Sequence, residues 1–101
     1  MSTPTHFDPE TRYALYQRAI KTYGQDAQWR QVQEECAELI AAVNRYKRGR
    51  ISMAELVGEI ADVRIMYEQA VILVGDPTLI ENTFLEKLAR LKERLDAEDQ
   101  T

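Results

Sequence analysis

Five acidic residues fall into two short groups whose spacing could let them act together. Glu34, Glu35 and Glu38 occur in the string EECAE, and Glu59 and Asp62 occur in EIAD. Residues three positions apart are neighbours on a helix surface, so Glu35/Glu38 and Glu59/Asp62 are two like-charged pairs. Carboxylates that are brought together and partly desolvated repel one another or take up protons. A divalent cation bound between them would remove that repulsion.

The elements that position these acids are predicted to be four helices, since no segment shows strand-like alternation. Asp8 followed by Pro9 is a strong start signal, because the Asp side chain can cap free amides and Pro is tolerated in the first turn. Gly24 ends that first helix. Asp26 is the expected cap of a second helix, which runs to about Tyr46.

The last two helices are predicted from two capping boxes. Ser52 with Glu55 begins a third helix, which continues to the Gly-Asp-Pro turn at residues 75–77. Thr78 with Glu81 is expected to begin a fourth helix, which ends at about residue 96. Residues 1–7 and 97–101 are expected to be flexible.

Two helices joined by a short connection usually pack antiparallel, so the acids of the second and third helices could converge on one spot. The chain has one histidine, His6, and one cysteine, Cys36, so no zinc set can form. Hard oxygen ligands without His or Cys favour Mg²⁺, with Mn²⁺ as a substitute. A ferritin-like di-iron site requires Glu-x-x-His pairs and is excluded on that ground. The alternative is that these acids only form surface ion pairs, with Arg45, Lys47 or Arg64 as partners.

Length and composition limit the classes of protein to consider. The 101 residues suffice for one all-α domain over residues 1–101, with a four-helix bundle-like protomer. The content of 45% hydrophobic and 30% charged residues excludes a disordered chain. The net charge of −4 argues against a nucleic-acid partner, and no apolar run is long enough for a membrane span. We therefore expect a cytoplasmic protein.

The third helix is apolar on two sides, which predicts a homo-oligomer. At about 100° per residue, one apolar face and a second patch well separated from it can be distinguished. The first contains Leu56, Ile60, Val63, Tyr67, Ala70 and Val71, and the second contains Ala61, Ile65 and Ile72. A chain of this size can hardly cover both without another subunit, so we expect a homodimer or a dimer of dimers with the second and third helices at its centre. A monomer with a central third helix is the alternative.

The two acidic groups resemble the EExxE and ExxD motif of the MazG-like all-α nucleotide pyrophosphohydrolases. The surrounding text WRQVQEECAELIAAVNRY and LVGEIADVRIMYEQ is similar to that family through most of the second and third helices, about half of the chain. The resemblance implies an oligomeric helical bundle whose acids hold Mg²⁺ against a nucleoside triphosphate. It implies Glu35, Glu38, Glu59 and Asp62 as metal ligands, and Glu34 as the residue that orients or deprotonates water.

The function expected from this resemblance is Mg²⁺-dependent hydrolysis of a (d)NTP to a (d)NMP and pyrophosphate, by attack of an activated water at the α phosphate. Four carboxylates with one Mg²⁺ leave a charge of about −2, and a triphosphate adds about −4, so more than one Mg²⁺ per site is expected. The alternative function is a non-catalytic helical dimer that binds a nucleotide or a protein partner around a structural cation site.

Basic and aromatic residues are candidates for substrate contact. Lys47 and Arg48 lie in a basic cluster between the acidic helices, where they could equally complement a helix C-terminus. Lys87 and Arg90 recur at helical spacing in the fourth helix, where the resemblance suggests phosphate contact and surface ion pairs are the alternative. Trp29 could stack on a base or belong to the core. Cys36 is interpreted as a buried small hydrophobe.

Overall fold

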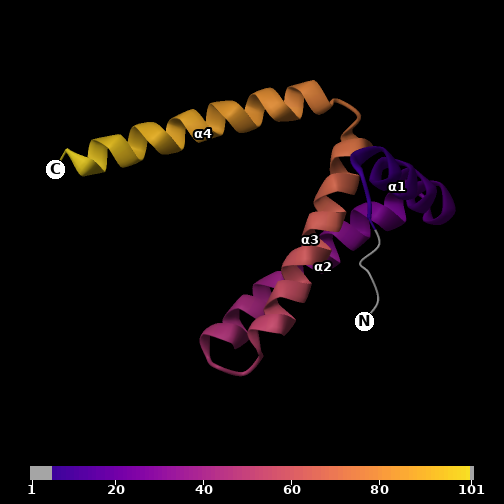
Figure 1. Ribbon diagram of the computed structural model, residues 1–101, viewed down its shortest axis with the longest axis horizontal. Coiled ribbons are helices and arrows are strands. Elements are labelled where there is room, and N and C mark those ends of the chain that lie inside the picture. The colour runs from indigo at the N-terminus through magenta and orange to yellow at the C-terminus, as the bar shows by residue number, and fades with distance from the viewer. Residues whose placement is uncertain (1–5, 101) are drawn as a thin grey trace.

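The structure, a computed structural model, describes residues 6–100 and is all-helical over that range, without a strand. In chain order the helices are α1 (Pro9–Tyr23), α2 (Gln25–Lys47), α3 (Met53–Val74) and α4 (Pro77–Asp99), as Figure 1 shows. Residues 1–5, on which most of the expectation for residues 1–7 falls, lie outside the described part, as does Thr101. Within residues 6–100, no helix is long and apolar enough to cross a membrane.

Local capping chemistry begins α1 and α3 as the sequence predicts. The Asp8 side chain accepts a hydrogen bond from the Thr11 amide at 2.8 Å, with Pro9 in the first turn. At the start of α3, Ser52 and Glu55 satisfy each other's backbone amides in a capping box. These bonds satisfy amides that have no partner within the helix, so they fix where each helix begins.

Two predicted helix starts and one predicted end are wrong. Helix α2 begins at Gln25 directly after Gly24, whose φ of 92° lets the chain turn sharply from α1, and Asp26 makes no capping bond. Helix α4 is capped by Asp76, which accepts from the Leu79 amide at 3.1 Å, so Thr78 already lies inside the first turn. The Asp-Pro pair therefore acts as a helix start rather than a turn, and α4 continues beyond residue 96 to residue 99.

Helices α2 and α3 pack side by side and antiparallel, forming the α2–α3 hairpin (Figure 1). Ala42 and Met66 are buried in the seam between them, where the small alanine lets the helices approach closely. Gln28 and Gln69 are buried in the same seam, and Gln28 Nε2 donates to Gln69 Oε1 at 2.6 Å.

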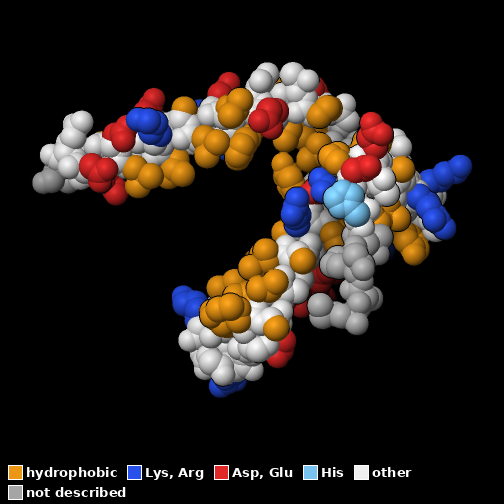
Figure 2. Space-filling model, viewed as in Figure 1, with side chains coloured by type: hydrophobic (Ala, Val, Ile, Leu, Met, Phe, Trp, Pro, Cys, Tyr) orange, Lys and Arg blue, Asp and Glu red, His pale blue; other side chains and the backbone are white. Residues whose placement is uncertain are grey.

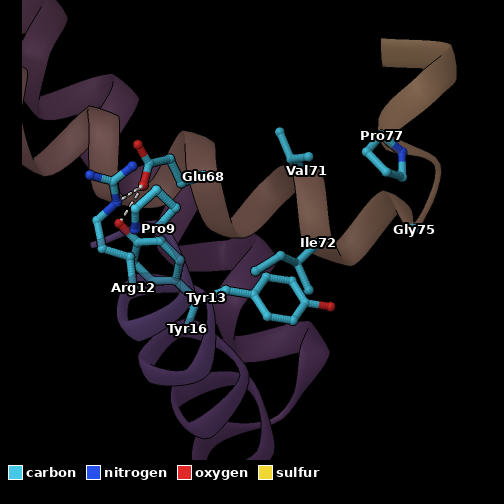
Figure 3. A pocket seen from close by; sticks show the side chains of 9 residues that line it. All are labelled: Pro9, Arg12, Tyr13, Tyr16, Glu68, Val71, Ile72, Gly75 and Pro77. Carbon is cyan, nitrogen blue, oxygen red and sulfur yellow. Dashed lines mark hydrogen bonds and ion pairs between the residues drawn. The ribbon is translucent and has the colours of Figure 1, made fainter. Parts of the chain in front are cut away.

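Helix α1 is fastened to α3 through one carboxylate. The Tyr16 hydroxyl donates to Glu68 Oε1 at 2.7 Å, and Arg12 Nε lies 3.5 Å from the same oxygen, as the dashed lines in Figure 3 show. Arg64 donates to Glu68 Oε2 at 3.2 Å. Burial acts to raise the pKa of Glu68, but the hydrogen bonds from Tyr16 and Arg64 and the positive charge of Arg12 outweigh it and lower the pKa overall. Glu68 is thus held as a carboxylate between the two helices.

Helix α4 extends away from the rest of the chain and leaves the four helices without a closed bundle (Figure 1). The radius of gyration is 17.2 Å, against about 13 Å for a globular domain of this length. Within residues 6–100 the buried apolar core consists of Tyr16, Ala42 and Met66. The first apolar face expected on the third helix is only partly covered in this chain. Ile60 and Tyr67 are more than half exposed, whereas the other members are half-buried, namely Leu56, Val63, Ala70 and Val71.

The exposure of one side chain differs from its prediction. Cys36 is predicted to be buried and is exposed. On α1, Tyr23 is 68% exposed, whereas Tyr16 is buried. The exposure of Cys36 and Tyr23 follows from the open architecture, since positions that a closed bundle would cover face outward here.

The first prediction concerns the attachment of α1. Tyr16→Phe removes the hydroxyl that donates to Glu68 and should lower the free energy of unfolding by about 1 to 2 kcal/mol. Urea unfolding followed by circular dichroism measures the change. Tyr23→Phe is the matched control, because that tyrosine is exposed, and it should leave the urea midpoint unchanged. Equal effects of the two substitutions would contradict the role given to the Tyr16–Glu68 bond.

Candidate functional site

The α2–α3 hairpin brings three of the predicted acids together. Glu35 and Glu38 on α2 and Glu59 on α3 each offer a carboxylate oxygen, and these oxygens all lie within 4.8 Å of one another. Glu35 and Glu59 are half-buried and Glu38 is exposed. The convergence requires both the i, i+3 spacing on α2 and the antiparallel packing that places the middle of α3 opposite. Exposed acidic groups of this kind are common without an ion, so the grouping alone does not define a metal site.

Two oxygens of the group are buried without a hydrogen-bond partner. They are Glu35 Oε2 and Glu59 Oε2, while Glu35 Oε1 accepts from Gln31 Nε2 at 3.1 Å. Burial, followed by the charges of Glu38 and Asp62, raises the pKa of both Glu35 and Glu59. The protein therefore holds carboxylates that water does not fully solvate and that lack a compensating donor.

Asp62 and Glu34 take different positions relative to this group. Asp62 lies outside the 4.8 Å group, but its charge contributes to the raised pKa of Glu35 and of Glu59, so it is a near neighbour. Glu34 is exposed, and one helical position places it about 100° round α2 from Glu35. Three of the four predicted ligands are thus assembled and the fourth lies close by. Glu34 is outside the group of three, but it lies one helical turn from Glu38 and only about 40° round α2 from it.

A pocket of about 530 Å³ borders the acids on the side of the α2–α3 turn. Its lining residues are Ala37, Glu38, Ala41, Ala42, Arg45, Ile51, Glu55 and Glu59. Three alanines leave space at its floor, and the positive charge of Arg45 partly offsets the rise in the pKa of Glu59. The pocket therefore combines three acids with one cation, so its net negative charge favours a cation, and an anionic group could enter only together with positive charge.

Arg45 and Glu55 were not among the predicted site residues. The signal for both was available in their spacing, because Arg45 follows Glu38 by seven residues, or two helical turns, and Glu55 precedes Glu59 by four. Both positions repeat on the face that carries the acids. The basic cluster at residues 45–50 lies at the turn between α2 and α3, but only Arg45 of this cluster lines the pocket.

None of the five predicted substrate-contact residues lines this pocket. Trp29 is 38% exposed and about one third of a turn round α2 from Glu35. Lys47 and Arg48 are exposed at the end of α2, and Lys87 and Arg90 lie on α4, which projects away from the acids (Figure 1). Lys47 lies in the last turn of α2 and Arg48 at its C-cap, which agrees with the alternative that they complement a helix C-terminus. Among the described residues no ion pair is formed by Lys87 or Arg90, the alternative expected for them.

A second pocket, of about 370 Å³, lies where α1, α3 and the start of α4 meet (Figure 3). Its walls include Tyr13, Val71 and Ile72. Its one acid is Glu68, which already accepts hydrogen bonds from Tyr16 and Arg64 and forms an ion pair with Arg12. This apolar pocket contains no unpaired carboxylate. The chemistry that the sequence suggests is therefore located at the middle of the hairpin and not in this hollow.

Comparison with models of known protein families, with curated proteins and with solved structures finds no match to this chain. The resemblance to the MazG-like family therefore depends on the acidic motifs and their surroundings. The geometry adds that three of the motif acids meet across two antiparallel helices.

The second prediction is that the acid group destabilises the fold when no divalent cation is present. A carboxyl whose folded pKa is raised binds more protons folded than unfolded, so stability falls as pH rises from its ordinary value of 4.5 through the raised pKa. In EDTA, Glu35→Gln should therefore raise the melting temperature above that of the unaltered protein at about pH 8, and this gain should vanish near about pH 4.

Glu34→Gln removes a charge from the same helix outside the group and is the control for this experiment. Differential scanning fluorimetry across the pH range compares the two variants. An equal gain from both would mean that the effect comes from net charge on α2 and not from the cluster.

Proposed function

We propose that this protein is a Mg²⁺-dependent nucleoside triphosphate pyrophosphohydrolase of the MazG-like kind. The observation that carries the proposal is the pair of buried, unpartnered oxygens, Glu35 Oε2 and Glu59 Oε2, in a group of three converging carboxylates. A buried acceptor without a donor is unfavourable unless something positive compensates for it. A bound cation supplies that compensation.

The donor set suits a hard divalent cation. Glu35, Glu38 and Glu59 offer only carboxylate oxygens, and Asp62 is close enough to join them through its own carboxylate or a shared water. Mg²⁺ and Mn²⁺ prefer such ligands, whereas zinc prefers His and Cys. Since four acids and a triphosphate together carry about eight negative charges against one Arg45 in the pocket, more than one Mg²⁺ is part of the proposal.

When bound, Mg²⁺ would neutralise phosphate charge and lower the pKa of a coordinated water. The chain's own residues would position the substrate. Arg45 can pair with phosphate oxygens in the pocket beside Glu38, and the alanine floor leaves room for them. Glu34, predicted to orient water, lies outside the group of three but one helical turn from Glu38, and its assignment depends on the resemblance.

The proposed reaction breaks one phosphoanhydride bond. The oxygen of water joins the α phosphorus, the bond from that phosphorus to the oxygen bridging it to the β phosphorus breaks, and the water proton is lost to a base or solvent. The products are a (d)NMP and pyrophosphate. Positioning and charge neutralisation account for most catalysis of this type, which is why acids and cations, without a covalent nucleophile, are sufficient.

The proposal includes a homo-oligomer, a dimer or a dimer of dimers, acting in nucleotide metabolism in the cytoplasm without nucleic acid or membrane as partner. A second function has support in the wide exposure of apolar side chains. In that case the chain is a non-catalytic helical dimer that binds a nucleotide or a protein, and the acids hold a structural cation. The two functions differ in whether pyrophosphate is released.

The third prediction is metal-dependent pyrophosphate release. A panel of ribo- and deoxyribonucleoside triphosphates, incubated with the protein in Mg²⁺, should yield pyrophosphate and monophosphate in equal amounts from at least one member, and none in EDTA. A coupled pyrophosphate assay with chromatography of the nucleotide measures both products. Release of orthophosphate instead of pyrophosphate would contradict cleavage at the α phosphate. Mg²⁺-dependent stabilisation without any hydrolysis would favour the structural cation site.

The fourth prediction locates the chemistry on the acid group. Glu38→Gln keeps the size of the side chain but removes its charge, so it should lower kcat/KM by at least about 100-fold with helicity unchanged. Glu93→Gln, on the exposed surface of α4, is the matched control and should leave kcat/KM unaltered. Full activity of the Glu38 variant would contradict the metal-ligand assignment even if the protein is a pyrophosphohydrolase.

A further inference from the structure

Helix α4 carries an apolar stripe that nothing in the chain covers. Phe84, Leu88, Leu91 and Leu95 follow one another at intervals of four, three and four residues, which places them on one side of the helix. Each is between 43% and 52% exposed. Figure 2 shows apolar side chains along the side of α4 that is turned toward the α2–α3 hairpin. This spacing is typical of a helix that packs against other helices along its length.

The α2–α3 hairpin has an apolar surface of its own, separate from the seam. On α2 it consists of the exposed residues Trp29, Cys36, Ile40 and Val43, and on α3 of Met53, Val57, Ile60 and Tyr67. The α2 residues are turned about 60° to 160° from Gln28 and Ala42, and the α3 residues about 100° to 180° from Met66 and Gln69. The antiparallel arrangement brings the members of both sets that lie nearest the seam to one side of the hairpin. Glu38 and Asp62 are turned the other way.

The solvent-accessible surface area of one chain is larger than expected for a folded monomer of its mass. The chain exposes 8459 Å², whereas a folded monomer of 11.7 kDa exposes about 5,900 Å², an excess of about 2,600 Å². Obligate homodimers bury about 2,000 to 5,000 Å² or more in total, or about 1,000 to 2,500 Å² from each partner. The excess on one chain is therefore at the upper end of what one partner of the same size covers.

We propose that two copies of this chain clasp each other, with α4 of each copy packed along the apolar surface of the other copy's α2–α3 hairpin. The chain carries both halves of the contact, so a two-fold arrangement satisfies both copies at once. Both elements are also of matching length, since α2, α3 and α4 have 23, 22 and 23 residues, or about 34 Å each.

The corner between α3 and α4 favours the partner's hairpin over the chain's own. Gly75 has a φ of 78° and its amide donates to Val71 O, while Asp76 caps the Leu79 amide and Pro77 fixes the first turn of α4. The backbone conformation of Gly75 and Asp76 sets the direction in which α4 leaves α3, and it would have to change for α4 to fold back on its own hairpin. In the present conformation α4 projects away from the hairpin (Figure 1).

The clasp does not rest on the proposed function, because the acids lie in the seam or on its other side, outside the surface that the clasp covers. It would nevertheless place one predicted substrate-contact residue beside the partner. On α4, Lys87 lies at one edge of the apolar stripe, whereas Arg90 is about 130° from the centre of the stripe. With α4 packed on the partner's hairpin, Lys87 would border the other copy and Arg90 would face away from it.

The first test is the mass of the protein in solution. Sedimentation equilibrium of the full chain should give twice the 11.7 kDa of one copy. Leu88→Glu places a charge in the apolar stripe and should weaken association by about 100-fold or more. Asn82→Glu places the same charge on the opposite side of α4 and should leave the dimer intact. A monomeric unaltered protein, or equal weakening by both variants, would overturn the proposal.

The second test identifies which chain α4 contacts and uses only mild substitutions. Phe84→Cys, Leu88→Cys and Leu91→Cys, made one at a time, each place a thiol on the stripe, and Cys36 is the natural thiol on the hairpin surface. Mild oxidation should join two chains covalently in at least one variant, and Ala89→Cys, off the stripe, should not do so. Adding Cys36→Ser to the reacting variant should abolish the covalent dimer.

Other outcomes exclude the clasp. A disulfide within one chain, seen as a monomer that has lost both thiols, would show that α4 folds back on its own hairpin. A covalent dimer that persists in the Cys36→Ser background would show that the two α4 helices pair with each other. A dimer by sedimentation without any disulfide specific to the stripe would place the interface elsewhere. None of these readouts depends on hydrolysis, so they are distinct from failure of the proposed function.

Discussion

The packing of α2 against α3 is the contact on which the rest of the molecule depends. Helix α1 has a defined position only because Tyr16 and Arg12 reach Glu68 on α3, and α4 leaves from the end of α3. The acids of the two motifs meet only because these two helices lie antiparallel. The buried apolar core within residues 6–100 is small, and two of its three residues, Ala42 and Met66, belong to this hairpin.

The same contact holds groups that oppose it. Apolar and amide contacts at Ala42, Met66 and Gln28 favour the hairpin, while Glu35 and Glu59 introduce like charges with raised pKa values into it. Sites that bind cations commonly show this conflict, because ligands suited to a metal repel one another without it. This arrangement is explained if a bound cation restores the folding free energy that is lost to repulsion between the carboxylates.

Local signals allowed much of the fold to be predicted from the sequence. Asp8 and the Ser52–Glu55 box determine helix starts through bonds within four residues, and i, i+3 spacing determines that Glu35 and Glu38 are neighbours. The exposure of Cys36, the direction of α4 and the pocket position of Arg45 depend on how whole helices pack. Periodicity identifies an apolar face without saying what covers it, so these features required the three-dimensional structure.

The hydrogen bond between Gln28 and Gln69 has a consequence for alignment. Apolar ridges on two long helices can slide past each other at little cost, but a buried amide pair is satisfied at only one register. A slip by one helical turn moves a residue about 5.4 Å, which exceeds the 4.8 Å over which the three carboxylates gather. The Gln28–Gln69 hydrogen bond therefore fixes the register of α2 against α3. It keeps Glu35 and Glu38 opposite Glu59, although these acids are more than one helical turn from the glutamines.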